Sequence, residues 1–222
     1  MNLNIVQKIY EAIAFLFAIS VHESAHAWVA NRCGDPTARM LGRITLNPIK
    51  HIDPIGTILI PVVALYYNYP LIGWAKPTPV DPRHFKYQVR DDILTSLAGP
   101  ASNLLVAFVA VIGLAIVSST SILGHELVHG AVVGSSSLLE PFTQMLYAFL
   151  EINVLLAAFN IIPVPPLDGS HVLRHFLPDN IRQIYDRIGV FALILLFVAG
   201  SRIIAFFTAP FFAFFDAILA RI

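Results

Sequence analysis

The stretch "FAISVHESAHAWVANRCGD", residues 17–35, places three ionisable side chains inside a long apolar run. These are His22, Glu23 and His26, and the run around them covers about Ile5–Ala30. A run of about 20 apolar residues predicts a membrane-spanning helix, in which ionisable groups are costly and are expected to have a function. The i, i+4 spacing puts both histidines on one helical face, where they can bind one metal ion.

The composition of the whole chain supports a membrane environment. Of its 222 residues, 57% are hydrophobic and 13% are charged, whereas soluble domains have about 45–50% and about 25%. We therefore predict an α-helical polytopic membrane protein, with residues 1–222 as a single domain embedded in the lipid bilayer. The net charge of zero gives no reason to expect nucleic-acid binding, and Cys33 alone allows no internal disulfide. Nothing in the sequence indicates an oligomeric state.

Four stretches are long and apolar enough to be full transmembrane helices. They are roughly Ile5–Ala30, Ile93–Val117, Phe142–Ile162 and Ile188–Phe207. A fifth, Ile55–Tyr69, is short and contains Pro61, so we expect a re-entrant or partial helix there. The aromatic tail Pro210–Ile222 is expected to lie along the membrane interface.

The distribution of basic residues predicts the orientation. If Ile55–Tyr69 enters the membrane and returns, residues 31–92 and 163–187 share one face, which then carries eleven of the fourteen Lys and Arg. The loop 118–141 carries none. The positive-inside rule makes the basic face cytoplasmic, which predicts a multi-pass protein of the prokaryotic cytoplasmic membrane. His22 lies about 12 Å from the cytoplasmic end of its span, so the site is expected toward the cytoplasm.

Two segments on the same face are expected to be extended. "RMLGRITLNP", Arg39–Pro48, resembles a strand, and "PLIGWAKPTPV", Pro70–Val80, has three prolines and a glycine. Together they predict a small membrane-associated β-sheet or hairpin, whose free edge could pair with a substrate strand.

A catalytic zinc ion needs a third protein ligand and leaves one position for water. Asp168, in "FNIIPVPPLDGSHVL" (residues 159–173), follows the span Phe142–Ile162 and returns to the side of His22. Prolines break the helix before it, although an Asp-Gly pair is also common in an ordinary surface turn. Glu23 is placed to take a proton from the attacking water, as in the H-E-x-x-H arrangement of metalloproteases.

Other polar groups are weaker candidates. "GHELVHG", residues 124–130, repeats the H-E-x-x-H pattern in the loop without basic residues, and we expect a short surface helix there. Its ionisable residues are His125, Glu126 and His129. His171 and His175 share the i, i+4 spacing without a glutamate between them, and they are expected to be solvated on a cytoplasmic helix.

Two asparagines interrupt apolar runs, where an amide needs hydrogen-bond partners. Asn103 and Asn160 could hold the substrate backbone or stabilise the oxyanion that forms during attack. The alternative is hydrogen bonding between helices, which is common in membrane bundles.

At this point the sequence resembles a family. Five motifs in order carry the resemblance: "HESAH" at 22–26, "DPIGT" at 53–57, "GWAKPTPV" at 73–80, "AGPASN" at 98–103 and "NIIPVPPLDG" at 160–169. They look like the site-2 protease family of intramembrane zinc metalloproteases, in its prokaryotic short form without a PDZ or CBS domain.

The resemblance implies that His22, His26 and Asp168 bind one catalytic Zn²⁺ and that Glu23 activates water. It also implies a role in the site for Asn160, and for Asn103. The function expected from it is regulated cleavage of peptide bonds in or near transmembrane segments of other membrane proteins. Two alternatives stay open, namely a metal-binding membrane transporter and an inactive relative that binds transmembrane helices. A transporter would need more polar residues along its spans, and an inactive relative would not need Glu23.

Overall fold

The computed structural model of the chain describes residues 3–67, 73–130, 134, 135, 137–199 and 201–221. These residues form helices joined by turns and extended segments, and no β-strand is found among them. The elements are α1 (Leu3–Cys33), α2 (Thr37–Met40), η1 (Pro48–Lys50), η2 (Pro54–Leu59), α3 (Ile60–Tyr66), η3 (Pro82–His84), α4 (Gln88–Thr120), α5 (Ile122–Val128), α6 (Leu139–Ile161), α7 (Asp168–Arg174), α8 (Asp179–Ala199) and α9 (Ser201–Leu219).

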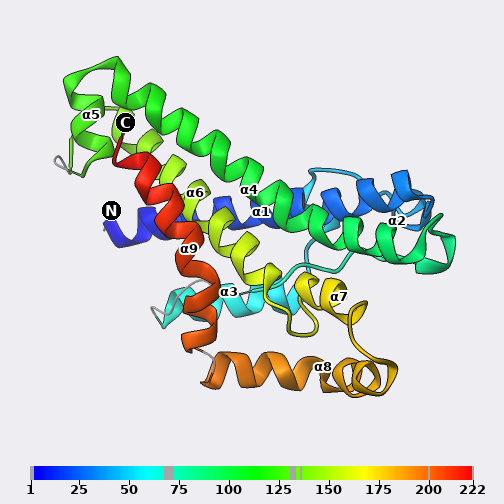
Figure 1. The fold of residues 1–222 in the computed structure, drawn as a ribbon. Coiled ribbons are helices and arrows are strands. Elements are labelled where there is room, and N and C mark those ends of the chain that lie inside the picture. Colours follow the sequence, from blue (N-terminus) through cyan, green and yellow to red (C-terminus); the bar gives the residue numbers. More distant parts are fainter. Residues whose placement is uncertain (1–2, 68–72, 131–133, 136, 200, 222) are drawn as a thin grey trace.

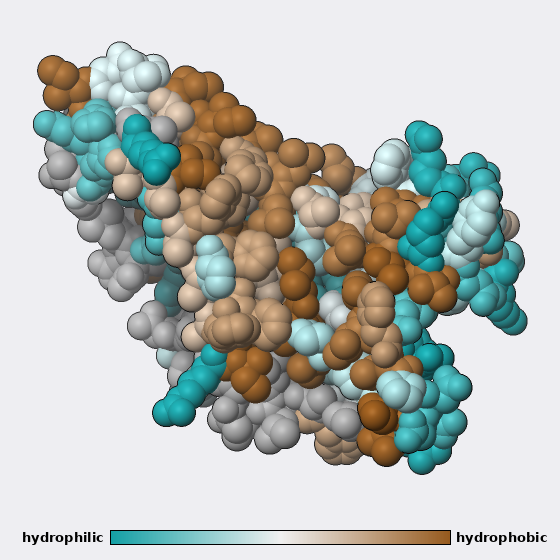
Figure 2. All heavy atoms as spheres, viewed as in Figure 1, coloured by the Kyte–Doolittle hydropathy of each residue, from teal (hydrophilic) through white to brown (hydrophobic). Residues whose placement is uncertain are grey.

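Four helical stretches are long and apolar enough to cross a membrane. They are Ile5–Cys33 of α1, the whole of α4, the whole of α6, and Arg202–Leu219 of α9. Figure 2 shows hydrophobic residues over the middle of the molecule and hydrophilic residues gathered toward its ends, as a multi-pass membrane protein requires.

Helices α1, α4 and α6 pack against one another at the centre of the molecule (Figure 1). Burial between helices gains an apolar side chain little in lipid, so transmembrane helices associate through close packing instead. Small side chains make this close approach possible. Ala14 and Ala18 of α1, Ala107 of α4 and Ala148 of α6 are at most 5% exposed. Phe215 of α9 packs in a cluster with Ala107 of α4 and Val154 of α6, so α9 lies against these two helices.

The fourth candidate span lies further along the chain than predicted. The predicted span Ile188–Phe207 includes residue 200, which lies outside the described residues, and its described part is divided between α8 and α9. The tail from Pro210 does not lie apart at the interface, because residues 210–219 are the second half of α9. Proline is tolerated inside a transmembrane helix when neighbouring groups satisfy the backbone.

The short apolar segment is too short to cross a membrane as a helix. Helices η2 and α3 together cover Pro54–Tyr66, about 20 Å of helix, which is shorter than the hydrocarbon core of about 30 Å. The returning chain lies against the entering chain, since the N–H of Trp74 donates to the carbonyl of Gly56 at 3.2 Å. The N–H of Lys76 likewise donates to the carbonyl of His51 at 2.8 Å. These contacts bring residues 74–76 back beside the start of the segment.

The predicted β-sheet was wrong for the described residues. Arg39–Pro48 contains the end of α2 and a series of turns, with Gly42 at a φ of 66°. Residues 73–80 are extended but form no ladder. A buried side chain takes the place of a partner strand, because the guanidinium of Arg43 donates to the carbonyls of Lys50, Lys76 and Pro77.

Candidate metal centre

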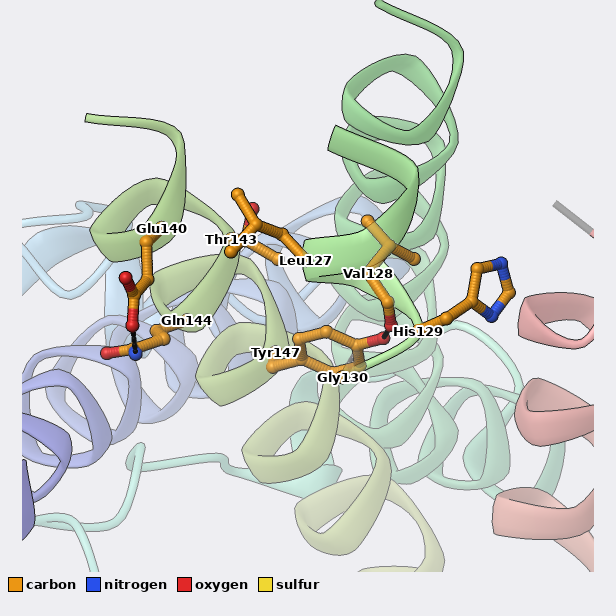
Figure 3. Close-up of a pocket in the computed structure, with 8 residues that line it drawn as sticks. All are labelled: Leu127, Val128, His129, Gly130, Glu140, Thr143, Gln144 and Tyr147. Atoms are coloured by element: carbon orange, nitrogen blue, oxygen red, sulfur yellow. Dashed lines mark hydrogen bonds between the residues drawn. The ribbon is translucent and has the colours of Figure 1, made fainter. Parts of the chain in front are cut away.

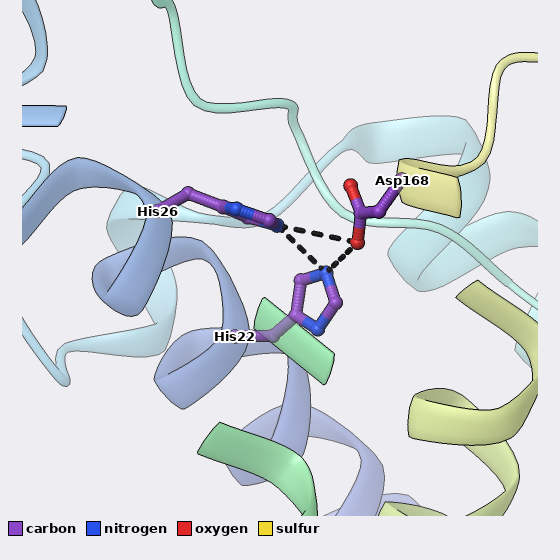
Figure 4. Close-up of side chains that lie close together, drawn as sticks. All are labelled: His22, His26 and Asp168. Carbon is purple, nitrogen blue, oxygen red and sulfur yellow. Dashed lines mark hydrogen bonds and ion pairs between the residues drawn. The ribbon is translucent and has the colours of Figure 1, made fainter. Parts of the chain in front are cut away.

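Three side chains from two distant parts of the chain converge at one point (Figure 4). Nε2 of His22 lies 3.0 Å from Nε2 of His26. Oδ2 of Asp168 lies 3.1 Å from the first nitrogen and 3.4 Å from the second. Both histidines are buried and Asp168 is half-buried. No other group of three His, Cys, Asp or Glu comes this close among the described residues.

The three atoms fit the coordination shell of a zinc ion. Ligand atoms about 2.0–2.1 Å from a tetrahedral ion are about 3.3–3.4 Å from one another. The three separations, 3.0, 3.1 and 3.4 Å, are close to this value. Oδ2 of Asp168 is also buried without a hydrogen-bond partner. A cation bound by the three atoms would give that oxygen a partner. It would also lie between the two imidazole nitrogens, which otherwise face each other.

Contacts from α4 orient both imidazole rings. Nδ1 of His26 donates to the carbonyl of Thr95 at 2.6 Å, and Nδ1 of His22 donates to Oδ1 of Asn103 at 2.6 Å. Because each Nδ1 carries the proton, each Nε2 presents its lone pair to the metal position.

Asn103 is itself held by a network inside the bundle. Its amide nitrogen donates to Oδ1 of Asn153 at 2.8 Å and to the carbonyl of Ala18 at 3.2 Å. Asn153 in turn donates to the carbonyl of Phe149 at 2.7 Å. Asn103 and Asn153 are both fully buried. The hydrogen bonds of the Asn103 amide therefore fix it in place so that it can orient His22. Its polar atoms do not face an open surface.

Asp168 is brought to the histidines by a tight bend after α6. It is the first residue of α7, and Gly169 packs directly against the carbonyl groups at the end of α6. A Cβ at Gly169 would lie 2.8 Å from the carbonyl oxygen of Ile162 and closer still to that of Ile161. Burial alone would raise the pKa of Asp168, but His26 and His22 hold it below its usual range. The bend therefore places the carboxylate of Asp168 against the two histidines.

Glu23 lies beside the metal ligands on the half-buried side of α1. Its Oε2 accepts a hydrogen bond from the N–H of Thr78 at 2.7 Å. The hydroxyl of Thr78 donates to the backbone carbonyl of Glu23 at 2.9 Å. The extended segment, residues 73–80, thereby holds the carboxylate that is the candidate proton acceptor.

Gly99 of α4 lies against both imidazole rings. A Cβ there would be 2.5 Å from Cε1 and 2.6 Å from Nε2 of His22, and closer still to Nε2 of His26. Real Cβ atoms do not come this close to other atoms, so any side chain at this position would have to displace the rings.

We expect Gly99→Ala to weaken zinc binding by about 10–100-fold, the effect of disturbing the groups that orient metal ligands. Zinc affinity is measured on the purified protein by competition with a chelator of known affinity. Gly113→Ala is the matched control in the same helix, because its Cβ would meet only the flexible side chain of Leu146, at 3.0 Å. Equal zinc affinities in the two variants would contradict the packing argument.

The second asparagine is placed differently from the first. The side chain of Asn160 donates to the carbonyl of Leu156, one turn back in α6, at 2.9 Å. This is its single hydrogen bond among the described residues, and the side chain is only partly buried. The amide of Asn160 therefore keeps hydrogen-bonding capacity for another molecule.

The second H-E-x-x-H motif does not form a metal centre among the described residues. The rings of His125 and His129 are tilted by 58° with centroids 4.3 Å apart, but no third ligand among the described residues joins them. A cavity of about 380 Å³ between α5 and α6 has His129 and Glu140 in its lining. Figure 3 shows these two side chains on opposite sides of the cavity. Glu140 accepts hydrogen bonds from the N–H of Gly134 and from Gln144.

The sequence predicts that His171 and His175 are solvated, but the structure places His175 in a contact with another helix. Nε2 of His175 lies 2.7 Å from Oδ2 of Asp92 in α4, and the His175 side chain is 18% exposed. His171 is more exposed, with Nδ1 3.8 Å from Oδ1 of the same aspartate.

Sequence reasoning missed several groups that surround the candidate ligands. The sequence does contain a signal for Asn153, because it is an amide in an apolar stretch seven residues before Asn160. Thr95 had none, because it acts through its backbone carbonyl. Thr78 was noted only as part of an extended segment, and its contact with Glu23 depends on how that segment packs.

Comparison with known proteins agrees with this geometry. Peptidase family M50 matches residues 10–198 of the chain. "Putative zinc metalloprotease YwhC" of Bacillus subtilis is 38% identical over 173 residues, which are 78% of this chain and 71% of that protein. "Putative zinc metalloprotease Rip2" of Mycolicibacterium smegmatis is 27% identical over 177 residues, 77% of this chain and 58% of that protein. "Putative zinc metalloprotease Rip2" of Mycobacterium tuberculosis (strain H37Rv) is 27% identical over 196 residues, 83% and 63% of the respective chains.

No solved structure matches the chain significantly. The family match covers most of the chain and includes the helix with both histidines, the Gly99 region and the Asp168 turn. The H-E-x-x-H helix and the remote carboxylate that meets it are the features expected of a zinc peptidase. The chain therefore belongs to peptidase family M50 and is a zinc metalloprotease.

Proposed function

We propose that this protein is an intramembrane protease that hydrolyses peptide bonds in or near transmembrane segments of other membrane proteins. The observation that carries the proposal is the convergence of His22, His26 and Asp168 within a bundle of helices able to span the bilayer. His22 lies about 16 Å along α1 from its end at Cys33, which is inside the hydrocarbon core of a membrane about 30 Å thick. A substrate bond that reaches this depth belongs to a membrane segment.

The proposed chemistry assigns one role to each group of residues. His22, His26 and Asp168 hold the zinc ion, which when bound polarises a carbonyl and lowers the pKa of water to about 7. Glu23 accepts the proton of the attacking water and passes it to the leaving amine. Asn103 keeps the His22 ring in position, and Asn160, with free capacity on its amide, is the candidate for contact with the substrate backbone.

The orientation of the site toward the cytoplasm is part of the proposal. It rests on the basic residues of 31–92 and 163–187, and on the hydrogen bonds that bring residues 74–76 back beside the start of the short apolar segment. The substrate strand would find few donors on the extended segment. Among residues 74–78 the N–H groups of Trp74, Lys76 and Thr78 are already occupied and Pro77 has none. Among these five residues, Ala75 therefore keeps an N–H group that a substrate strand could use.

Removal of zinc from the purified protein tests the proposal. We expect the protein, reconstituted in liposomes with single-span membrane proteins, to produce truncated fragments whose new termini map within or near the spans. A chelator such as phenanthroline should abolish these fragments, and added zinc should restore them.

Fragments that persist without zinc would contradict the proposal. A zinc-dependent flux of metal across the liposome membrane, without any peptide cleavage, would instead favour the transporter alternative.

A further inference from the structure

We propose that the contact between Asp92 and His175 positions Asp168, so that Asp92 and His175 are positioning residues of the zinc site. This inference rests on the proposed assignment of Asp168 as the third metal ligand. Nε2 of His175 lies 2.7 Å from Oδ2 of Asp92. The side chains are only 18% and 11% exposed, so the contact is largely protected from solvent.

Helix α7 needs such a contact because it is too short to hold its own direction. It has seven residues, and isolated helices of fewer than about 12 residues are marginally stable. Its first residue is Asp168 and its C-cap residue is His175. The tight bend at Gly169 holds one end, and the contact with Asp92 holds the other.

The spacing along the two helices makes α4 a template for the site. Asp168 and His175 are seven residues apart on α7, and Asp92 and Gly99 are seven residues apart on α4. Seven helical residues span about 10.5 Å. Since His175 meets Asp92 while Asp168 meets the rings that pack on Gly99, the two helices lie antiparallel with matched spacing.

One face of α4 therefore serves all three candidate ligands. Thr95 accepts a hydrogen bond from His26, Asn103 accepts one from His22, and Asp92 accepts one from the helix that carries Asp168. The first two contacts act on the ligands directly, and the third acts through α7. Loss of the third should leave the histidines in place and let the carboxylate move away from them.

The test is the zinc affinity of purified full-length variants, measured by competition with a chelator. We expect Asp92→Ala and His175→Ala each to lower the affinity by about 10–100-fold. The double variant should lose no more than Asp92→Ala alone, because His175 acts through its contact with Asp92. His175→Gln can still donate a hydrogen bond to Asp92, so it should restore much of the affinity lost in His175→Ala.

Arg174→Ala is the matched control. It removes the exposed ion pair between Arg174 and Asp186, 3.1 Å apart, which links the same helix to α8. We expect wild-type zinc affinity in this variant. If Asp92→Ala fails to fold, His175→Ala carries the test from the other helix.

Wild-type zinc affinity in both Asp92→Ala and His175→Ala would overturn this inference and leave the proposed function intact. An equal loss of affinity in Arg174→Ala would also overturn it, since any disturbance of α7 would then suffice. A wild-type protein that holds no zinc at the site would overturn the proposed function together with the inference.

Discussion

Glu23→Gln is expected to reduce peptide-bond hydrolysis by about 10²–10⁴-fold while zinc remains bound. This is the usual contribution of a positioned general base. Glutamine has nearly the shape of glutamate, and its amide oxygen can still accept the hydrogen bond that the N–H of Thr78 gives to Glu23. The variant therefore removes the ability to accept a proton and leaves the local packing unchanged.

The measurement pairs two assays on the same preparation. Fragment formation from a reconstituted single-span substrate gives the activity, and elemental analysis gives the zinc content per chain. Glu126→Gln, in the other H-E-x-x-H motif, is the control and should keep wild-type activity. Full activity in Glu23→Gln would remove Glu23 from the reaction, and it would leave the zinc site itself unaffected.

Asp168→Ala is expected to lower zinc affinity on the order of 10³-fold, because it removes one of three protein ligands. The two histidines alone would leave the ion with half of its tetrahedral shell from protein. Activity should fall with zinc content, and excess zinc should restore it only in part, because the variant changes the geometry of the site.

Glu126→Ala is the comparison for this variant as well. Its position lies in α5, outside the group of converging ligands, so zinc content should match that of the wild type. If Glu126→Ala lost zinc and Asp168→Ala kept it, the second H-E-x-x-H motif would be the metal centre. Zinc affinity that is unchanged in both would exclude the arrangement of His22, His26 and Asp168 as the binding site.

The sequence predicted the zinc metalloprotease family, and the family match confirms that prediction. Four membrane-spanning helices were also predicted, and four candidate spans are present in the described residues. The roles of Glu23, Asn103 and Asn160 stay predictions. The structure nevertheless separates the two asparagines. Asn103 is buried against His22, whereas the one hydrogen bond of the Asn160 side chain within the described part of the chain goes to its own helix.

The error in the β-sheet has a clear physical cause. Prolines and β-branched residues predict an extended backbone, but they do not say which groups satisfy its carbonyls. Here the guanidinium of Arg43 donates hydrogen bonds to carbonyls that lie 7, 33 and 34 positions away along the chain. A basic residue on a predicted cytoplasmic loop gave no sign that it would be buried.

The sequence by itself determined the features that depend on short-range spacing. The length of the apolar runs and the i, i+4 placement of His22 and His26 follow from the geometry of a single helix. Only the tertiary structure decided which groups orient those ligands. His26 meets Thr95 across 69 positions, and His22 meets Asn103 across 81. The physical reason is that such contacts arise where α1, α4 and α7 pack together, and helical periodicity does not encode which residues of two packed helices will face each other.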